Sequence, residues 1–282
     1  MPSPTVPRVT LPSGETVPAL GMGTWMMGES PARRADELAA LRAGLDLGLT
    51  LIDTAEMYGE GLAEALVAEA IAGRRDEVFI VSKVYPHNAT RRGTAAACER
   101  SLKRLATDRI DLYLLHWRGG VPLGESLEAL AALQKAGKIR HYGVSNLDLA
   151  DMREAWALDA GRAVAVNQLL YNPVRRGIEW DLLPWMRERR MPLMAYSPIE
   201  QARLLRHQGL VAFARRHAMS PAQAALAWAL RDGATIVIPK ASSAARVREN
   251  AQARDITLAP AQLAELDALF APPSRATPLE ML

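Results

Sequence analysis

Short apolar runs alternate with longer amphipathic segments along most of the chain. Apolar runs of this length predict strands buried on both faces, and the amphipathic segments predict helices that cover them. The eight expected strands span residues 19–23, 49–53, 78–83, 110–116, 139–145, 163–168, 191–197 and 235–240. The expected helices span residues 33–48, 61–72, 91–106, 124–136, 148–158, 178–190, 208–231 and 260–270. Ser220 before Pro221 is typical of a helix start, and Gly48, Gly73 and Gly137 are typical of helix ends.

The order of these elements predicts an α/β fold, a (β/α)8 barrel of the TIM type. Strands buried on both faces and separated by helices form a parallel sheet, and eight such units can close into a barrel. Residues 8–20 predict an N-terminal β-hairpin that caps the bottom of the barrel, with a turn at Pro12–Ser13–Gly14. An open doubly wound sheet is the alternative, but "GMGTWM" (21–26) has only part of the glycine fingerprint that such a sheet would carry. No linker divides the chain, so we expect one domain over residues 1–282.

The composition narrows the class of protein. Of the 282 residues 49% are hydrophobic, which is typical of a globular protein, and no apolar run approaches the ~18 residues of a membrane helix. The N-terminal stretch "MPSPTVPRVTLPSG" lacks the apolar segment of a signal peptide, so we expect a cytoplasmic protein. The net charge is only +3 and the arginine pairs are scattered, so neither nucleic acid nor a membrane is an expected partner. We expect the chain to be a monomer.

Cys98 is the only cysteine in the chain. One cysteine excludes an intrachain disulfide and a cysteine-based metal cluster. It stands in a helical pattern, "TAAACERSL", and is expected to be a small buried residue. No spacing of histidine and glutamate suggests another kind of metal site, so we expect no metal.

Polar side chains stand at the ends of neighbouring expected strands, where a barrel of this kind forms its active site. The second strand ends at Asp53, with Tyr58 in the following loop, and the next two strands end at Lys83 and His116. Taken singly, each could be a loop cap, a surface charge or a core residue. Together they suit one catalytic group. Lys83 would lower the pKa of the Tyr58 phenol, which is about 10 in water, and Asp53 would pair with Lys83 and keep it charged. His116 would hydrogen-bond to a substrate oxygen, and a tuned tyrosine suits the general acid that a carbonyl reduction needs.

Long motifs in a fixed order run from about residue 8 to residue 270. They are "GMGTW" (21–25), "LIDTAEMYG" (51–59), "VSK" (81–83), "DLYLLHW" (111–117), "GKIRHYGVSN" (137–146), "VNQLLYN" (166–172), "MAYSP" (194–198) and "IPKASSAARVREN" (238–250). In these motifs the chain resembles the aldo-keto reductase family. Two further stretches, "WRGGVPLGES" and "YNPVRRGIEWDLLPW", are most similar to bacterial members that reduce methylglyoxal and other small or aromatic aldehydes.

The resemblance implies a reaction on a small-molecule carbonyl substrate. The family's catalytic tetrad falls on the four residues that the strand ends also single out: Asp53, Tyr58, Lys83 and His116. In the family a hydride moves from a nicotinamide cofactor to the carbonyl carbon, while the tyrosine protonates the oxygen. The cofactor carries the hydride chemistry, and the protein supplies orientation and electrostatics.

The resemblance also implies the residues that would contact the dinucleotide. Those beside the nicotinamide and its ribose are Gly23, Thr24, Trp25, Ser145, Asn146, Gln168 and Tyr196. Those along the pyrophosphate, the 2′-phosphate and the adenine are Ser197, Ile199, Lys240, Ser242, Ser243, Arg246, Glu249 and Asn250. For Ser145 and Asn146 an alternative is to cap the helix that is expected to begin at residue 148.

The last motif predicts which nucleotide is bound. Lys240 leads into a short helix with Ser242, Ser243 and Arg246 on its opening turns, and a helix N-terminus offers free N–H groups to an anion. Lys240 and Arg246 add the positive charge that suits a 2′-phosphate, so we expect NADPH in preference to NADH. Many family members carry serine where this chain has Ala241, which leaves dual specificity open.

The expected substrate pocket has aromatic walls, formed by Trp25, Tyr58, His116 and Trp117, and suits small or flat aldehydes. The alternative for both tryptophans is packing at the barrel rim. The short loops and the brief tail predict an open pocket of broad selectivity. A different class of function also fits the tetrad, namely a cofactor-binding regulatory subunit of the same fold with little turnover, like the β-subunits of potassium channels.

Overall fold

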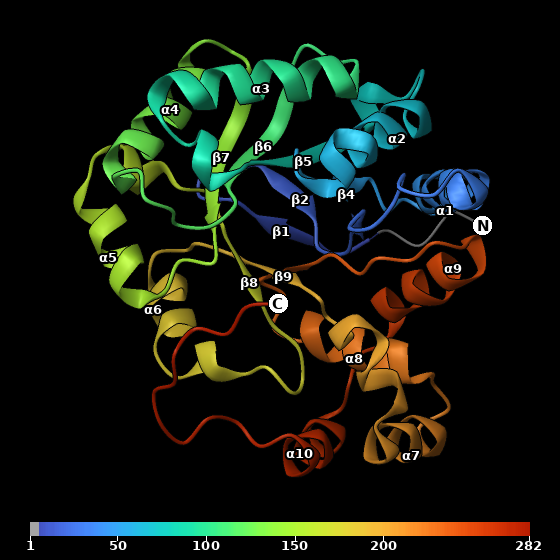
Figure 1. Cartoon of the computed structure of the whole chain (residues 1–282). Coiled ribbons are helices and arrows are strands. Elements are labelled where there is room, and N and C mark those ends of the chain that lie inside the picture. Colours follow the sequence, from blue (N-terminus) through green and yellow to red (C-terminus); the bar gives the residue numbers. More distant parts are fainter. Residues whose placement is uncertain (1–5) are drawn as a thin grey trace.

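The computed structural model describes residues 6–282, in which eight parallel strands are surrounded by helices (Figure 1). Residues 1–5, at the start of the stretch considered as a signal peptide, lie outside the described part. In chain order, which is also their spatial order, the strands are β3 (Met22–Gly23), β4 (Leu51–Asp53), β5 (Phe79–Val84), β6 (Ile110–Leu115), β7 (Ile139–Ser145), β8 (Asn167–Leu170), β9 (Leu193–Tyr196) and β10 (Thr235–Val237). The helices are α1 (Arg34–Asp46), α2 (Leu62–Ala70), α3 (Arg91–Leu105), α4 (Leu123–Lys135), α5 (Leu149–Ala157), α6 (Leu182–Glu188), α7 (Gln208–Arg216), α8 (Pro221–Leu230), α9 (Ala244–Gln252) and α10 (Pro260–Leu269).

The first and last strands meet and close the sheet into a barrel. The Gly21 amide donates to the Val237 carbonyl at 2.9 Å, and the Gly23 amide donates to the Pro239 carbonyl at 3.0 Å. A Cβ at position 23 would lie 3.0 Å from the Ile238 carbonyl oxygen, so glycine permits this close approach. The prediction of a (β/α)8 barrel is confirmed.

Successive side chains of a strand alternate between the barrel interior and the layer beneath the helices. In β6, Leu112 and Leu114 pack in the interior, whereas Tyr113 and Leu115 pack with the residues under the helices. Both sets are almost wholly buried, which explains why the strands appear in the sequence as continuous apolar runs.

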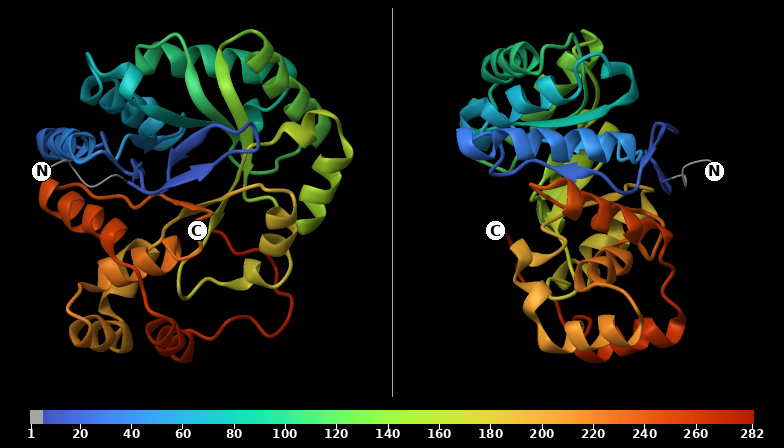
Figure 2. Two further views of the ribbon diagram at one scale, coloured as in Figure 1. Left: turned by 180° about the vertical axis from the view of Figure 1, so that it is seen from behind. Right: turned by 90° about the vertical axis from the view of Figure 1, so that its right-hand side faces the viewer.

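An antiparallel hairpin of β1 (Arg8–Thr10) and β2 (Thr16–Pro18) closes the end of the barrel opposite the carboxyl ends of the strands. Its Val9, Leu11 and Val17 pack into the same interior cluster as the strand side chains. Figure 2 shows the hairpin in front of the strands when the molecule is seen from behind. The predicted cap of the barrel bottom is therefore present.

A network of ion pairs ties the hairpin to the barrel bottom. Glu15, in the hairpin turn, accepts hydrogen bonds from Arg140 at 2.7 Å and 2.8 Å and lies 2.7 Å from His141 Nε2. Arg140 also donates to Asp111 at 2.9 Å. Asp111 is 2% exposed and accepts a further hydrogen bond from Arg75 at 2.8 Å. Two arginines thus compensate the negative charge of this buried carboxylate.

Two sequence expectations are wrong in detail. The helix expected over 208–231 is two helices, α7 and α8, because Ala218 has a left-handed backbone and Ser220 begins a new helix. The Ser220 side chain accepts from the Gln223 amide, and Gln223 reciprocates in a capping box. The strand expected over 163–168 begins later, at β8, because residues Ala160–Ala163 form a 3-10 turn.

Candidate active site

A buried ion pair joins the ends of β4 and β5. Asp53 is the last residue of β4, and its register partner on β5 is Val81, which packs in the barrel interior. Lys83 lies two residues beyond Val81 and therefore faces the same side of the strand. Its Nζ lies 2.8 Å from both carboxylate oxygens of Asp53 and donates to the Thr54 carbonyl at 2.9 Å. The side chain of Lys83 is 0% exposed and that of Asp53 is 4% exposed, so the pair is shielded from solvent.

Tyr58 begins a short 3-10 turn in the loop after β4. Its Oη lies 3.3 Å from Lys83 Nζ, and its ring meets the ring of His116 edge-on with centroids 5.8 Å apart. The turn ends at Gly61, whose φ of +94° is a conformation that glycine adopts without strain. The structure therefore brings the acid, the phenol, the ammonium and the imidazole into one group.

The ionisation of this group differs from the sequence expectation in one respect. Burial and the charge of Asp53 raise the pKa of the Tyr58 phenol well above its usual 10.0. Burial lowers the pKa of Lys83, and the carboxylate of Asp53 opposes that shift. Because Asp53 neutralises Lys83, the ammonium does not overcome the cost of burying a phenolate. The expected lowering of the Tyr58 pKa is wrong for the chain without cofactor, and the phenol stays protonated.

His116 is a neutral imidazole in this structure. Burial and the charge of Lys83 lower its pKa from 6.5 to about 2. Its Nδ1 is buried and has no hydrogen-bond partner among the described residues. A neutral imidazole carries one N–H donor and one acceptor, so it can bind a substrate oxygen without adding a charge to the site.

Polar side chains at the ends of β7, β8 and β9 form a network beside the ion pair. Asn146 donates to Ser145 Oγ at 3.1 Å and to the His116 carbonyl at 3.2 Å, and it accepts from Tyr196 Oη at 3.0 Å. Gln168 Nε2 donates to Asp53 Oδ1 at 2.8 Å. The amides expected to hold a carboxamide are thus linked to the catalytic group.

The alternative function for Ser145 and Asn146, capping the next helix, is wrong. The N-cap of α5 is Asp148, whose carboxylate accepts from the Asp151 amide at 2.9 Å. Asn146 has a φ of +57°, a left-handed conformation that asparagine tolerates better than most residues. The backbone therefore turns at Asn146 toward the barrel mouth before the helix begins.

The residues that end β3 differ in exposure. Gly23 lies beside Lys240 in a parallel bridge, and Thr24 is fully buried, with its hydroxyl donating to the Asp53 carbonyl at 2.9 Å. Trp25 is 44% exposed and makes no ring contact with Tyr58 in the described part of the chain. Thr24 thus fixes the loop that carries Trp25, while the indole stands open to an incoming molecule.

The residues expected at the pyrophosphate lie in the loop after β9. Ser197 and Ile199 are half-buried there. Ser197 has a φ of +48°, and residues 200–202 also have left-handed backbones, with φ between +50° and +68°. Consecutive non-glycine residues in this conformation cost free energy, so the surrounding contacts must hold the loop.

The residues expected around the 2′-phosphate and the adenine gather at the start of α9. Ser242 and Ser243 precede the helix rather than lie within it, and Ser243 is its N-cap without a side-chain capping bond. Lys240 is half-buried, and burial lowers its pKa. Arg246 is exposed, Glu249 is half-buried and Asn250 is buried. Cations and an unused hydroxyl therefore surround a helix N-terminus, which suits an anion.

Two further residues belong to the site, although the ends of the expected strands did not single them out. Tyr85 packs against Trp117 with ring centroids 5.0 Å apart, and Trp117 packs against His116 at 4.8 Å. Glu56 accepts hydrogen bonds from the Tyr85 amide at 2.8 Å and from Asn88 at 3.0 Å. Tyr85 thus extends the aromatic wall. In the sequence, Tyr85 stands two residues after Lys83 and Glu56 stands three residues after Asp53, so each lies just beyond the end of an expected strand.

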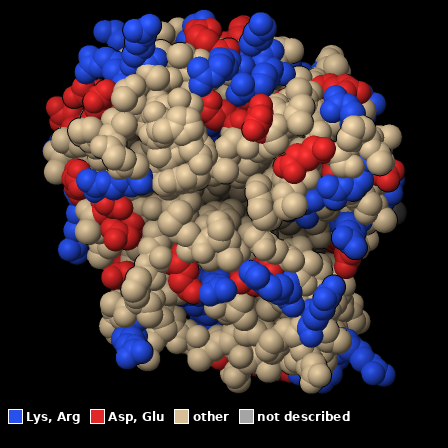
Figure 3. Space-filling model, viewed as in Figure 1, with Lys and Arg blue, Asp and Glu red and all other residues tan. Residues whose placement is uncertain are grey.

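The surface above this group is hollowed and mostly uncharged. Figure 3 shows a depression near the centre of the face, bordered by side chains other than Lys, Arg, Asp and Glu, with charged groups further out. Within residues 6–282, no three or more His, Cys, Asp or Glu side chains are placed to hold a metal ion. In the same range, no helix is both long and apolar enough to cross a membrane.

Comparison with known proteins defines the class of this barrel. The model of the aldo/keto reductase family matches residues 19–271. The chain belongs to the aldo/keto reductase family, and its expected resemblance to that family is confirmed.

Individual relatives sharpen this result. The chain is 50% identical to methylglyoxal reductase YeaE of Escherichia coli, over 95% of this chain and 96% of that protein. It is 34% identical to glyoxal reductase of Bacillus subtilis, over 95% of each chain. It is also similar to an aldo/keto reductase of Klebsiella pneumoniae in complex with NADP and acetate. That similarity has a TM-score of 0.95 and 49% identity, over 99% of this chain and 100% of the other.

Proposed function

We propose that this aldo-keto reductase uses NADPH to reduce small dicarbonyls and aldehydes, with methylglyoxal as the first candidate, to alcohols. The observation that carries the proposal is the buried Asp53–Lys83 pair with the Tyr58 hydroxyl 3.3 Å from the ammonium. The substrate class is supported by the names of two relatives, a methylglyoxal reductase and a glyoxal reductase. The uncharged depression above the site suits a small neutral carbonyl compound (Figure 3).

The residues at the barrel mouth fit a nicotinamide dinucleotide. The buried Nδ1 of His116 lacks a partner, and the Ser243 hydroxyl caps no backbone group. Lys240 and Arg246 lie on either side of the N-terminus of α9 and supply positive charge. A bound cofactor of this kind supplies the hydride that reduces the carbonyl carbon.

In the proposed mechanism Tyr58 is the general acid. The phenol is protonated at neutral pH and is placed to donate its proton to the carbonyl oxygen. Neutral His116 donates a hydrogen bond to the same oxygen and orients the substrate. Lys83, held by Asp53, stabilises the phenolate that remains after the proton has left. The aromatic wall at Trp117 excludes water from this step.

The nucleotide specificity rests on the phosphate end of the site. We propose that Lys240, Ser242, Ser243 and Arg246 bind the 2′-phosphate, and that Glu249 and Asn250 lie beside the adenine. Ala241 packs against the core and offers no hydroxyl, so one phosphate contact is absent. NADPH is therefore preferred, but by a smaller factor than a complete set of contacts would give.

The experiment that tests this function is a panel of aldehydes and ketones with NADPH, measured at 340 nm. Methylglyoxal and nitrobenzaldehyde should be turned over many times per chain, and Tyr58→Phe should lose roughly 10²- to 10⁴-fold in kcat. Full activity of Tyr58→Phe would overturn the mechanism. A single turnover followed by retention of the cofactor would favour the regulatory-subunit alternative.

The same preparation tests the cofactor and the remaining expectations. Lys240→Met should raise the KM for NADPH more than that for NADH, whereas Lys135→Met, on the exposed last turn of α4, should change neither.

We also propose a single-domain monomer that works in the cytoplasm. Gel filtration should give the mass of one chain, 30.7 kDa. A dimer mass would contradict the monomer, and secretion in a cell-fractionation experiment would contradict the location.

A further inference from the structure

The last residues of the chain lie across the mouth of the barrel. Residues 271–282, after α10, form no helix or strand and end near the centre of the face in Figure 1. The Leu282 amide donates to Tyr196 Oη at 3.4 Å, and the same hydroxyl donates to Asn146 at 3.0 Å. The C-terminal end therefore touches the tyrosine that the family resemblance implies beside the nicotinamide.

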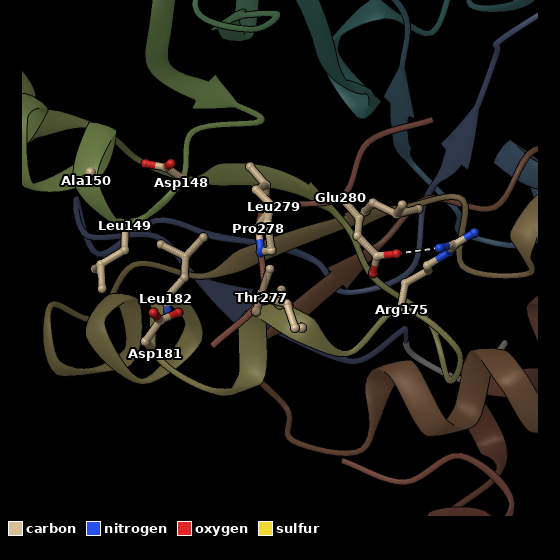
Figure 4. Close-up of a pocket in the computed structure, with 13 residues that line it drawn as sticks. Asp148, Leu149, Ala150, Arg175, Asp181, Leu182, Thr277, Pro278, Leu279 and Glu280 are labelled. Carbon is tan, nitrogen blue, oxygen red and sulfur yellow. Dashed lines mark hydrogen bonds and ion pairs between the residues drawn. The ribbon is translucent and has the colours of Figure 1, made fainter. Parts of the chain in front are cut away.

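One arginine links this tail to the loop after β9. The Arg175 guanidinium forms an ion pair with Glu280 in the tail, drawn in Figure 4, and binds Glu200 with its Nε at 3.1 Å and its Nη2 at 2.8 Å. Glu200 is 4% exposed and accepts from Asn172 at 2.7 Å. Asn172 in turn donates to the Ser197 carbonyl at 3.0 Å. Two separate segments thus share one cation.

Behind the tail the packing is incomplete. A pocket of about 130 Å³ lies between residues 277–280 of the tail and the side chains of Leu149 and Leu182 (Figure 4). This pocket is partly open to solvent, so the tail residues beside it are not packed on that side. Leu279 packs against the core, and the polar contacts of Glu280 and Leu282 hold the end of the tail.

We propose that Arg175 is a positioning residue that latches the tail over the aldehyde entrance, and that dinucleotide binding tightens this latch. The proposal rests on the proposed function, because the loop after β9 is there assigned to the pyrophosphate. A ligand that contacts Ser197 and Ile199 favours the folded state of this left-handed loop. Glu200 then holds Arg175 in place for Glu280, and by reciprocity an ordered tail strengthens dinucleotide binding.

Digestion from the C-terminus tests the latch directly. Carboxypeptidase Y should remove Leu282 and Met281 from the wild-type chain more slowly with saturating NADPH, by roughly threefold or more, as followed by intact mass. In Arg175→Met removal should be fast and independent of NADPH. Arg187→Met is the matched control, since this α6 arginine pairs with Asp232 at the surface and should behave as wild type.

Steady-state kinetics supply the second readout. Glu280→Gln breaks the Arg175–Glu280 pair and leaves the Arg175–Glu200 contacts in place. It should raise the KM for the aldehyde roughly three- to fivefold, the size expected for a partly exposed ion pair, with kcat within about twofold. Glu280 is 43% exposed, so this variant folds even where Arg175→Met does not.

The outcomes separate the two proposals. Equal digestion of wild type, Arg175→Met and Glu280→Gln, with NADPH present or absent, would overturn the latch even if the enzyme turns over aldehydes normally. An unchanged aldehyde KM in Glu280→Gln would overturn its effect on the entrance. Absence of any aldehyde turnover by the wild type would instead overturn the proposed function, and digestion without cofactor would still test the contact of Arg175 with the tail.

Discussion

The two ends of the barrel each contain a buried carboxylate paired with cations, yet they differ in what surrounds the pair. At the bottom, Asp111 accepts from two arginines and from a backbone amide at 2.8 Å, so all its partners are fixed. At the mouth, Asp53 is equally well satisfied, but its partner Lys83 touches the hydroxyl of Tyr58, and the neighbouring His116 has an unpartnered nitrogen. Where every polar group has a partner within the protein, the group stabilises the fold. A reactive site instead keeps some polar groups without a protein partner, so that they can bind a ligand.

The largest expected effect comes from Lys83→Met at the mouth. Activity should fall by roughly 10³-fold, because the phenolate of Tyr58 loses its stabilising charge. Unfolding in urea should also show a loss of stability, because Asp53 keeps only Gln168 as a side-chain partner. The control is the double variant Asp53→Asn/Lys83→Met, which should regain stability without regaining activity. Restored activity in that variant would contradict the assigned function of the pair.

The matching change at the bottom is Asp111→Asn. It leaves Arg75 without a counter-charge, while Arg140 keeps its pair with Glu15. The free energy of unfolding should fall by about 3 kcal/mol, at the low end of such effects because Arg140 retains this partner and is 42% exposed. The kcat of the folded enzyme should remain that of the wild type. A large loss of kcat with an unchanged free energy of unfolding would contradict this prediction, because Asp111 would then serve catalysis rather than stability.

A pH experiment sharpens the comparison at the mouth. His116 has a pKa of about 2 in the folded chain and 6.5 when unfolded, so the unfolded chain binds the extra proton. Stability is therefore complete above pH 6.5 and falls as the pH drops below it, by up to about 1.4 kcal/mol per pH unit. His116→Gln should remove this component, while His217→Gln, whose ring pairs with Glu265 near the surface, should retain it. Equal slopes in wild type and His116→Gln would contradict the neutral imidazole.

The smallest effect is expected from Glu15→Gln at the bottom. Burial raises the pKa of Glu15, but hydrogen bonds from His141 and Arg140 outweigh burial and hold the pKa below 4.5. Its stabilisation is therefore present above pH 4.5 and is lost as the pH falls through the folded value. Glu15→Gln should cost less than about 1 kcal/mol at pH 7, as chemical denaturation can measure, and should flatten the acid side of the profile. A loss of several kcal/mol in the free energy of unfolding would contradict this prediction. It would mean that the contacts of Glu15 stabilise the hairpin more than the burial of Val9 and Val17 does.

Much of the fold and the grouping of the candidate catalytic residues could be predicted because both follow from strand periodicity. Asp53, Lys83 and His116 were found at the strand ends, and the barrel brings those ends together. The pairing of Asp53 with Lys83 was expected and is present, but the direction of the Tyr58 pKa shift could not be predicted, because it depends on whether burial or the nearby charges dominate.

Contacts between distant segments could not be predicted from the sequence pattern either. The Arg175–Glu280 pair joins two loops with no periodicity. The sequence pattern predicts one helix where the structure has α7 and α8, although Ser220–Pro221 is typical of a helix start. Apolar periodicity continues across such a break, so the pattern shows which face is buried but not where the axis changes.

The closure between Gly23 and Pro239 has a consequence for synthesis of the chain. On the ribosome the segment with Asp53, Tyr58 and Lys83 emerges early, but the strand that closes the barrel beside Gly23 is made about 150 residues after Lys83. Until then the inner apolar side chains of a nascent, open sheet face water, which favours aggregation or chaperone binding. Translation speed between β4 and β10 therefore bears on the yield of active enzyme, although no residue in that interval needs to change.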